Sequence, residues 1–353
     1  MKLSGGVISE LRAEEFAWPE GDRPGELKFW HEVAVEVREA ITQALDSSLA
    51  LGGIHGARLY GLNSSDEPVG RYQLIMPEGS WFVRVSSRFG HPKLEQAITR
   101  YLVDYGVNVN PLIVAGKTLE WKGRPFRVDA RPMVDGRHFN GSSDDLGNLA
   151  SALATCHQAL KGFPMVSEIR GIASARYKRL ERIKERIRDA IGDGSFELFA
   201  ERADWASEHR DWLAEMTECF TPDLAQYSGA QCVHGEVHPG NVLFRADDGA
   251  AVLVDFEESI HLFAPPAWDL AFLVQRFCLS DYPTKKTVDH RITVITEAYR
   301  SPLPSLVDMM RQAAWFTVVT QLDLQLSEGV VSPVSEYDKF VELERQARCY
   351  PIV

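Results

Sequence analysis

The residues of this chain that are best suited to chemistry lie in the segment His234–Asn241 and at Asp255, fourteen residues beyond Asn241. Glu236 precedes Asn241 by five residues, which puts a carboxylate and an amide on one short loop. A carboxylate can accept the proton of an attacking hydroxyl, and an amide oxygen with a second carboxylate can hold Mg²⁺ against a chain of phosphates. We therefore expect Glu236 to be a base for phosphoryl transfer, and Asn241 and Asp255 to be Mg²⁺ ligands.

The flanking sequence predicts how these residues come together. Val242–Phe244 and Ala250–Val254 are apolar runs on either side of a strong turn signal, Asp247–Gly249. A strand, a turn and a second strand would bring Asp255 back to the end of the ribbon at which Asn241 lies. The alternative is a surface loop whose polar residues only cap and turn, and it requires the residue types, the spacing and the downstream acid to coincide.

The segments His234–Asn241 and Val254–Glu257 resemble the aminoglycoside phosphotransferase and choline kinase superfamily, whose loop usually reads H-G-D-x-H-x-x-N. The resemblance runs from about Gly53 to about Leu326 and is specific only around these two motifs. It implies an α+β, two-lobed protein-kinase-like fold with a small antiparallel-sheet N-lobe and a mostly helical C-lobe. It also implies ATP and Mg²⁺ as cofactors.

The resemblance groups Glu236, His234 and Asn241 as catalytic-loop residues, with Glu236 as the base and His234 positioning the loop, and it makes Asn241 and Asp255 the metal ligands. The usual base of the family is aspartate, so the carboxylate of Glu236 is displaced by about one bond length. A misplacement of roughly 1 Å can be costly in a positioned site. The loose transition state of phosphoryl transfer tolerates a modest shift, so we expect an active enzyme.

Two further residues resemble parts of the family that support the loop. Asp269, in Pro266–Ala271, corresponds to a buried aspartate that braces the loop. His157 ends a helical segment, Leu153–His157, and is expected to pack against its neighbours.

Short strand-like runs separated by turns predict the start of the nucleotide-binding lobe: Arg58–Leu62, Arg71–Met76 and Trp81–Val85. The first turn, residues 63–70, would cover the phosphates, and Ser64 and Ser65 could contact them. An ordinary hairpin loop explains this turn equally well, and Gly52-Gly53 is a weaker candidate for the same role.

Arg84 on the third run occupies the place of the lysine that kinases use to hold phosphates. Strand alternation puts Arg84 on the face of Phe82 and Ser86, which we expect to be the cleft, although an outward-facing arginine is the alternative. Glu95 lies in the first turn of a helix predicted from His91 to Tyr105, and it is expected to pair with Arg84. The helix dipole alone would also favour an acid there.

The last strand and the linker between the lobes resemble Arg127–Gly136, with backbone groups from Ala130 to Met133 meeting the adenine edge. We divide the chain into a leader and helix (1–50), a nucleotide-binding N-lobe (51–134) and a catalytic and substrate-binding C-lobe (135–353). Helical spacing or flanking signals predict these helices: Leu27–Leu51, Asp144–Leu160, Ile172–Ile191, Asp204–Phe220, Ala267–Leu279, Thr284–Tyr299 and Pro304–Leu326.

The phosphate acceptor is expected to be a hydroxyl of a small molecule, with a preference for a cationic one because acids follow Asp255. The side chains available to hold an amine or a sugar are Glu257, Glu258, Asp281, Asp308, Asp323 and Trp315. Two other functions remain open at this point. One is a nucleotide-binding pseudokinase that regulates a partner, and the other is a kinase for protein Ser/Thr.

Composition limits the partners and the compartment. The net charge of −12 argues against a nucleic-acid or anionic-membrane surface. The five cysteines are scattered and form no C-x-x-C pair, so neither a disulfide framework nor a zinc site is predicted. The first twenty residues have the wrong character for a signal peptide, and no apolar run is long enough for a bilayer, so we expect a cytoplasmic protein.

Overall fold

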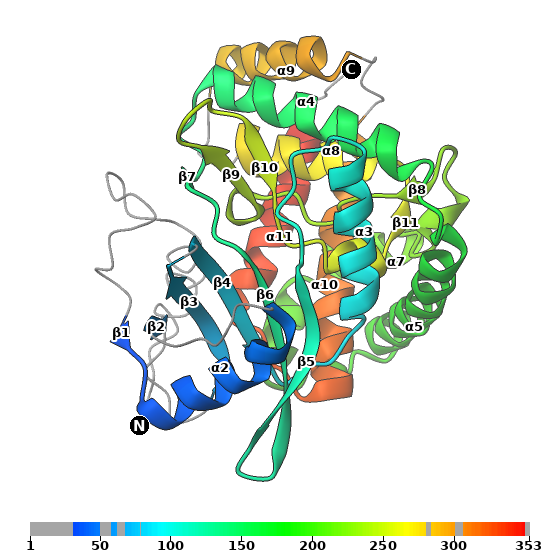
Figure 1. The fold of residues 1–353 in the computed structure, drawn as a ribbon. Helices are drawn as coiled ribbons and strands as arrows, with labels where there is room; N and C mark the ends of the chain where they lie inside the picture. The colour runs from blue at the N-terminus through cyan, green and yellow to red at the C-terminus, as the bar shows by residue number, and fades with distance from the viewer. Residues whose placement is uncertain are drawn as a thin grey trace.

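The computed structural model describes residues 31–49, 58–61, 68–77, 79–279, 284–300 and 306–349. Ser64, Ser65, Gly52-Gly53 and Asp281 lie outside the described residues. A sheet built from the first part of the chain lies beside a larger region of helices, as Figure 1 shows. This is the predicted α+β, kinase-like arrangement of a small antiparallel sheet and a mostly helical remainder.

One sheet of six antiparallel strands has the order β1-β2-β3-β4-β6-β5. Its strands are β1 (His31–Glu32), β2 (Arg58–Gly61), β3 (Gly70–Met76), β4 (Gly79–Ser86), β5 (Val114–Trp121) and β6 (Arg124–Pro132). The three predicted strands are confirmed as β2, β3 and β4. On β4, Val83 and Val85 are buried in the core of the sheet, which turns Arg84 to the opposite face.

Helix α2 (Val35–Leu49) covers the sheet with Val37, Ile41 and Leu45, which are buried at four-residue steps. The predicted helix from Leu27 began too early. His31–Glu32 instead form β1, because their backbone groups pair with the edge of β2. Helix α3 (Pro92–Asp104) begins with proline in its first turn and confirms the predicted helix there.

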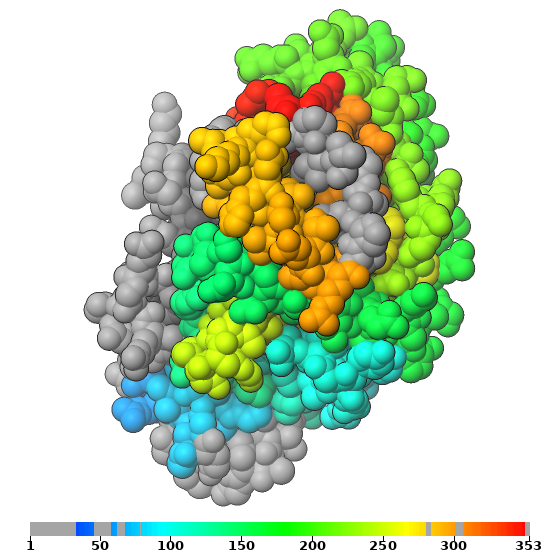
Figure 2. All heavy atoms as spheres, turned by 90° about the horizontal axis from the view of Figure 1, so that it is seen from above, coloured from blue at the N-terminus to red at the C-terminus, as the bar shows by residue number. Residues whose placement is uncertain are grey.

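The helices of the second region are α4 (Ser143–Leu160), α5 (Val166–Asp193), α6 (Ala203–Glu208), α7 (Arg210–Cys219), α8 (Ala267–Leu273), α9 (Lys285–Tyr299), α10 (Val307–Glu328) and α11 (Val334–Cys349). Helix α9 packs along α4, as Figures 1 and 2 show. The helix predicted over 204–220 is two helices, since the backbone leaves the helical region at His209 (φ −102°, ψ 22°). Helix α8 continues into a π-helical turn, Val274–Cys278.

Short strands hold the loops between the helices together: β7 (Gly136–Arg137), β8 (Gln231–Cys232), β9 (Val242–Arg245), β10 (Ala251–Leu253) and β11 (Phe263–Ala264). Strands β9 and β10 form the predicted antiparallel hairpin, and β7 pairs with its outer edge. Strand β8, which leads into the loop at His234, pairs with β11. Within the described ranges, no helix combines the length and apolarity that crossing a membrane requires.

Candidate active site

The β9–β10 hairpin brings Asn241 and Asp255 to one end, as predicted. Asn241 directly precedes β9, and Asp255 lies two residues after the end of β10. The N–H of Val254 donates to the carbonyl of Asn241 at 3.0 Å, which fixes the two segments side by side. Two potential metal ligands from separate parts of the sequence therefore share one site.

Asp269 braces the loop that carries Glu236. Its Oδ2 accepts hydrogen bonds from the backbone N–H of His234 (2.8 Å) and from Nε2 of His157 (2.9 Å). Its Oδ1 accepts from the N–H of Gly235 (2.8 Å), whose carbonyl accepts from Nε1 of Trp268 (2.9 Å). Burial would raise the pKa of Asp269, but the hydrogen bond and charge of His157 outweigh it, so the carboxylate stays ionised. This confirms the predicted contact of Asp269 with the loop.

His234 is fully buried. Its Nε2 lies 3.0 Å from the carbonyl of Val254, and its Nδ1 accepts from the N–H of Glu236 at 3.4 Å. These contacts require a neutral ring that donates from Nε2, and burial lowers the pKa of His234 in agreement. These contacts agree with the predicted role of His234 in positioning the loop.

Glu236 presents its carboxylate to solvent at the tip of the loop. The side chain is 49% exposed, and its Oε1 lies 3.8 Å from Nε2 of His238. The surrounding protein, followed by the charges of Glu258 and Asp255, raises the pKa of Glu236 to about 8. Burial, followed by Arg276, lowers the pKa of His238 to about 3, so the neighbouring ring is neutral. An accessible carboxylate with a raised pKa suits a base that works near neutral pH.

The residues predicted as Mg²⁺ ligands fit a cation. Asp255 has a left-handed backbone (φ +61°), and its Oδ1 is buried without a hydrogen-bond partner. An unsatisfied carboxylate oxygen is costly and points to a ligand. Asn241 donates from Nδ2 to the carbonyl of Glu236 (3.0 Å), which leaves its Oδ1 as the atom for a cation.

Oxygen donors of this kind suit Mg²⁺, which takes few protein ligands and completes its shell with phosphates and water. In the part of the chain that the structure describes, no group of three or more His, Cys, Asp or Glu side chains could hold a metal ion. A cation held by Asp255 and Asn241 would complete its shell with ligands from outside the chain.

Arg84 reaches this site from the sheet, on the predicted face of β4. Its Nη1 lies 2.8 Å from Oε2 of Glu257 and 3.8 Å from Oδ2 of Asp255. Burial would raise the pKa of Asp255, but the charges of Arg84 and then Arg131 reverse this and lower it. Asp255 is therefore ionised and ready to bind a cation.

The predicted pair between Arg84 and Glu95 is wrong. Glu95 instead accepts a hydrogen bond from Nη2 of Arg131 at 3.0 Å, and Nη2 of Arg127 lies 3.8 Å from its other oxygen. Strand β6 lies next to β4 and turns Arg131 towards α3, whereas Arg84 is held by Glu257. Burial raises the pKa of Glu95 against the lowering effect of Arg131.

This buried network was not predicted from the sequence, and it also includes a contact between Nε of Arg127 and Oδ2 of Asp129 at 2.5 Å. A signal was present. Arg127, Asp129 and Arg131 alternate along β6, and such spacing places all three charges on one face of a strand. Charges that alternate inside an otherwise apolar strand indicate a paired, buried set.

Some of the backbone groups predicted to meet adenine already form hydrogen bonds within the protein. The carbonyl of Ala130 accepts from the N–H of Ile113 at 3.0 Å, and its side chain is fully buried inside the sheet. The N–H of Met133 donates to the carbonyl of Ser80 at 2.8 Å. These groups are bonded within the sheet because β6 extends to Pro132.

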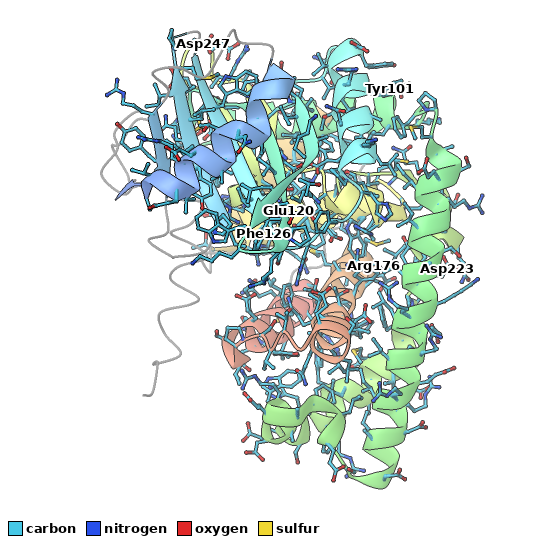
Figure 3. The ribbon with its side chains drawn as sticks, turned by 60° about the horizontal axis from the view of Figure 1, so that its bottom comes forward. Tyr101, Glu120, Phe126, Arg176, Asp223 and Asp247 are labelled. Atoms are coloured by element: carbon cyan, nitrogen blue, oxygen red, sulfur yellow. The ribbon has the colours of Figure 1, made fainter. Side chains whose placement is uncertain are left out.

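The residues suggested for acceptor binding separate into different surroundings. Glu257 pairs with Arg84, and Glu258 pairs with Arg176 at 2.6 Å. Arg176 lies on the side of α5 that faces the rest of the molecule, as Figure 3 shows. Asp323 lies 3.4 Å from the exposed Arg179, Asp308 is exposed and Trp315 is in the core.

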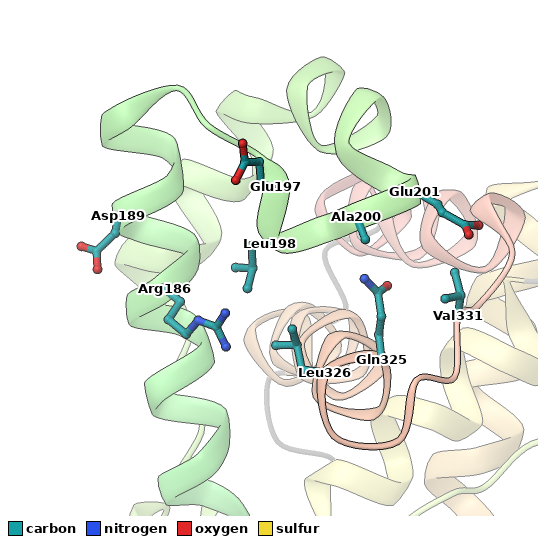
Figure 4. Close-up of a pocket in the computed structure, with 9 residues that line it drawn as sticks. All are labelled: Arg186, Asp189, Glu197, Leu198, Ala200, Glu201, Gln325, Leu326 and Val331. Atoms are coloured by element: carbon teal, nitrogen blue, oxygen red, sulfur yellow. The ribbon is translucent and has the colours of Figure 1, made fainter.

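A pocket also lies between α5 and the end of α10, away from the loop (Figure 4). The side chains around it are Arg186, Asp189, Glu197, Leu198, Ala200, Glu201, Gln325, Leu326 and Val331. None of the predicted site residues is among them.

Comparison with known proteins agrees with this site. The family model described as phosphotransferase enzyme family matches residues 65–286. This range includes the loop 234–241, the β9–β10 hairpin and Asp269. The chain belongs to this family. The predicted phosphotransferase is thereby confirmed at the level of the family. No curated protein sequence matches the chain.

Solved structures of this phosphotransferase family share the fold. Spectinomycin phosphotransferase APH(9)-Ia with AMP has a TM-score of 0.59 at 17% identity, over 88% of this chain and 98% of that one. The same protein with ADP and spectinomycin has a TM-score of 0.53 at 16% identity, over 88% and 98%. A putative aminoglycoside phosphotransferase from Ralstonia eutropha has a TM-score of 0.50 at 12% identity, over 88% and 95%. These likenesses confirm the predicted kinase-like fold.

Proposed function

We propose that this phosphotransferase moves the γ-phosphate of ATP, with Mg²⁺, to a hydroxyl of a small molecule such as an amino sugar, an amino alcohol or a related metabolite. One observation carries the proposal. The unpaired Oδ1 of Asp255 and the accessible carboxylate of Glu236 lie on one braced loop-and-hairpin unit. That unit offers a cation site and a base together, which phosphoryl transfer requires.

The positions of the residues support the following roles. Asp255 and Asn241 would hold Mg²⁺, which neutralises charge on the phosphates when bound. Glu236 would accept the proton of the acceptor hydroxyl at its carboxylate. Arg84 enters the site from the sheet and would donate its N–H groups to phosphate oxygens, for which it must share or leave its contact with Glu257.

The loop must hold Glu236 still while the hydroxyl attacks. Asp269 fixes two consecutive backbone N–H groups of the loop, and His234 fixes the N–H of Glu236 itself. These bonds orient the base before the substrate arrives, and such preorganisation is the main source of catalysis in reactions of this kind.

The small-molecule acceptor is supported by the relative whose structure contains ADP and spectinomycin. The preference for a cationic acceptor came from the acids that follow Asp255, of which Glu257 and Glu258 are the nearest in sequence. Because both carboxylates are in ion pairs, at 2.8 Å and 2.6 Å, they give that preference no support. The charge of the acceptor must be decided from other residues.

The metal site is tested by Asp255→Asn, which keeps the shape and removes the charge. We expect calorimetry to show that Mg²⁺ no longer strengthens binding of a non-hydrolysable ATP analogue. We also expect turnover to fall at least roughly 10²-fold, as when a main electrostatic group is removed. Asp247→Asn, at the exposed turn of the same hairpin (Figure 3), is the matched control and should behave as wild type.

Undiminished Mg²⁺-dependent nucleotide binding by Asp255→Asn would contradict the proposal. A wild-type protein that binds the nucleotide but phosphorylates no small molecule would favour the pseudokinase. Transfer of phosphate to proteins alone would favour the protein kinase.

A further inference from the structure

The cavity in Figure 4 lies between α5, the segment Glu197–Arg202 and the end of α10, and it has a volume of about 750 Å³. Natural sites for small ligands have volumes in this range. No residue assigned above to phosphoryl transfer is among the described residues that line it. The cavity is therefore a separate feature of the helical region.

Two helices that border the cavity also lead to the proposed site of phosphoryl transfer. On α5, Arg176 binds Glu258 at 2.6 Å, and its guanidinium group lies 5.0 Å from the ring of Phe316 on α10. Arg186 and Leu326, which line the cavity, lie ten residues further along the same two helices. Ten helical residues rise by about 15 Å. The cavity is thus almost three helical turns away from Glu258.

Gln325 carries a buried polar group at this cavity. The residue is 8% exposed, and its Oε1 has no hydrogen-bond partner among the described residues. Its amide turns towards Ala200 on the opposite wall, as Figure 4 shows. A half-turn of the amide exchanges its oxygen and its nitrogen, so the oxygen can face the cavity. A buried oxygen without a donor costs free energy, which a donor group of a ligand would recover.

Carboxylates outnumber cations around the cavity. Three of the described lining residues are acids: Asp189, Glu197 and Glu201. In the part of the chain that the structure describes, none of the three is in an ion pair. Arg186 is the one cation among the described lining residues, so the three negative charges exceed the positive charge by two. Arg202, next to Glu201, donates from Nε to the carbonyl of Ser332 at 2.9 Å and does not line the cavity. This balance favours a cationic ligand.

One side of the cavity is apolar. Leu326 (41% exposed) and Val331 (37% exposed) line it at the connection between α10 and α11. Val330 and Val334 are exposed on the same connection. Apolar side chains that lie together in water gain free energy when a ligand covers them. The ligand should therefore carry an apolar body as well as a charge.

We propose that this cavity binds an amphipathic organic cation, an amine attached to an apolar ring or chain. Its N–H group would donate to the amide oxygen of Gln325, and its charge would face Glu197 and Glu201. Its apolar part would cover Leu326 and Val331. The inference does not depend on the proposed phosphotransferase function, because it uses none of the residues assigned to that function.

The test uses tryptamine, tryptophol and indole-3-acetate, which share an indole ring and are cationic, neutral and anionic at pH 7. Binding to the full chain is measured by calorimetry without nucleotide. We expect tryptamine to bind about 10-fold more tightly than tryptophol, with indole-3-acetate the weakest. Glu201→Gln should weaken the binding of tryptamine and leave that of tryptophol unchanged. Glu185→Gln removes an exposed acid of α5 that does not line the cavity, and it should change neither.

A second pair of variants separates recognition from folding. Gln325→Leu should weaken tryptamine binding about 10-fold without lowering the midpoint of thermal unfolding, because the amide oxygen that it removes has no partner. Gln312, buried on the same helix, is the matched control. Its Oε1 accepts from the N–H of Thr221 and its Nε2 donates to the carbonyl of Cys219, both at 2.9 Å. Gln312→Leu should lower the midpoint and leave tryptamine binding unchanged.

Three results would overturn the inference. The first is a wild-type protein that does not bind tryptamine, or that binds the three indoles equally. The second is tryptamine binding that neither Gln325→Leu nor Glu201→Gln weakens, since the amine would then bind elsewhere. The third is an equal loss of thermal stability in Gln325→Leu and Gln312→Leu, which would assign the amide of Gln325 to the fold. Failure of the phosphotransferase proposal would leave all three tests in place.

Discussion

Glu236 combines water access with an electrostatic setting that favours its protonated form. The side chain is 49% exposed, so solvent moderates the effect of the protein around it. Glu258 and Asp255 nevertheless repel a third negative charge, which is the second cause of the raised pKa after burial. A base in this setting holds its proton more strongly than a free glutamate. Its pKa is therefore closer to that of the alcohol from which it takes the proton.

The pH dependence of the reaction follows from this residue. A base works when deprotonated, so kcat/KM for ATP should fall as the pH falls below about 8, towards the usual glutamate pKa of 4.5. Bound Mg²⁺ adds positive charge beside Asp255, so the midpoint in kcat should lie lower than in kcat/KM. Glu236→Gln should lose roughly 10²- to 10⁴-fold in kcat. If kcat/KM of that variant still falls at low pH in the same way, a group other than Glu236 causes the fall.

Asp269 is the residue whose loss should disturb the loop most. An asparagine there would turn one N–H₂ group towards the donors of His234, Gly235 or His157. Because the site is fully buried, we expect Asp269→Asn to cost about 3–5 kcal/mol in the free energy of unfolding, measured with urea. Asp289→Asn, in an exposed pair with Lys285, should change it by less than about 1 kcal/mol. An equal change in the free energy of unfolding for the two variants would contradict the role of Asp269 in stabilising the loop.

At the scale of elements, local patterns predicted the sheet better than the helix boundaries. Alternation and turn signals found β2, β3 and β4, and the resemblance placed a last strand within Arg127–Gly136, but β5 and the hairpin it forms with β6 were missed. Its turn, Lys122-Gly123, has positive φ at both residues (49° and 76°). Positive φ at both positions is typical of the type I′ hairpin turn, whose twist matches that of the two strands. Lysine is a rare first residue in such a turn, so the composition gave only the glycine as a signal.

The break between α6 and α7 has no glycine or proline to mark it. His209 lies at the break, and its ring stacks on Trp205 at a centroid distance of 4.6 Å. Trp205 in turn packs on Tyr337 of α11, a helix distant in sequence. Packing of this kind between distant segments cannot be obtained from the spacing of apolar residues within one window.

Strand β7 should tolerate no side chain at Gly136. A Cβ there would lie 2.7 Å from the backbone oxygen of Phe244 on β9, and this oxygen cannot move without opening the strand pair. We expect Gly136→Ala to destabilise the fold by about 1–3 kcal/mol, as overpacking does.

Gly171 in α5 is the matched control, because nothing lies within 4 Å of the position a Cβ would take. Gly171→Ala should stabilise by roughly 0.5–1 kcal/mol through helix propensity. Denaturant midpoints of the two variants should therefore move in opposite directions. A shift in the same direction would contradict the close approach at Gly136.

At the scale of the molecule, two kinds of contact join the sheet to the helical region. Arg84 on β4 reaches Glu257 after the hairpin, at 2.8 Å. The segment after α3 pairs with β10, since the N–H of Leu253 donates to Asn108 (3.0 Å) and the N–H of Asn110 donates to Leu253 (3.1 Å). The proposed nucleotide site lies where both regions contribute charge, so a ligand bound there would stabilise both.

Hydrogen exchange should show this joint stabilisation. A non-hydrolysable ATP analogue with Mg²⁺, at a hundred times its Kd, adds about 2.7 kcal/mol to the folded state. We expect slower exchange both in β4 and in the loop 234–241 when the analogue is present. Protection of β4 alone would place the nucleotide outside the proposed site.

Contiguous residues of the site could be predicted from the sequence, and pairings across the sheet could not. His234, Glu236, Asn241 and Asp255 lie within one hairpin unit, so spacing and turn chemistry were enough to place them together. The partner of Glu95 depends on β6 lying beside β4, and that order follows from the whole sheet and not from any one segment.

The left-handed backbone at Asp255 also determines which of the two acidic positions, 236 or 255, can hold either aspartate or glutamate. A φ of +61° suits aspartate, asparagine and glycine and resists longer side chains. Glu236 is not among the residues with positive φ, so its backbone accepts a glutamate as readily as an aspartate. At position 255 the main chain itself therefore opposes an exchange of aspartate for glutamate, in addition to any requirement of a bound metal, whereas the main chain at position 236 sets no such restriction.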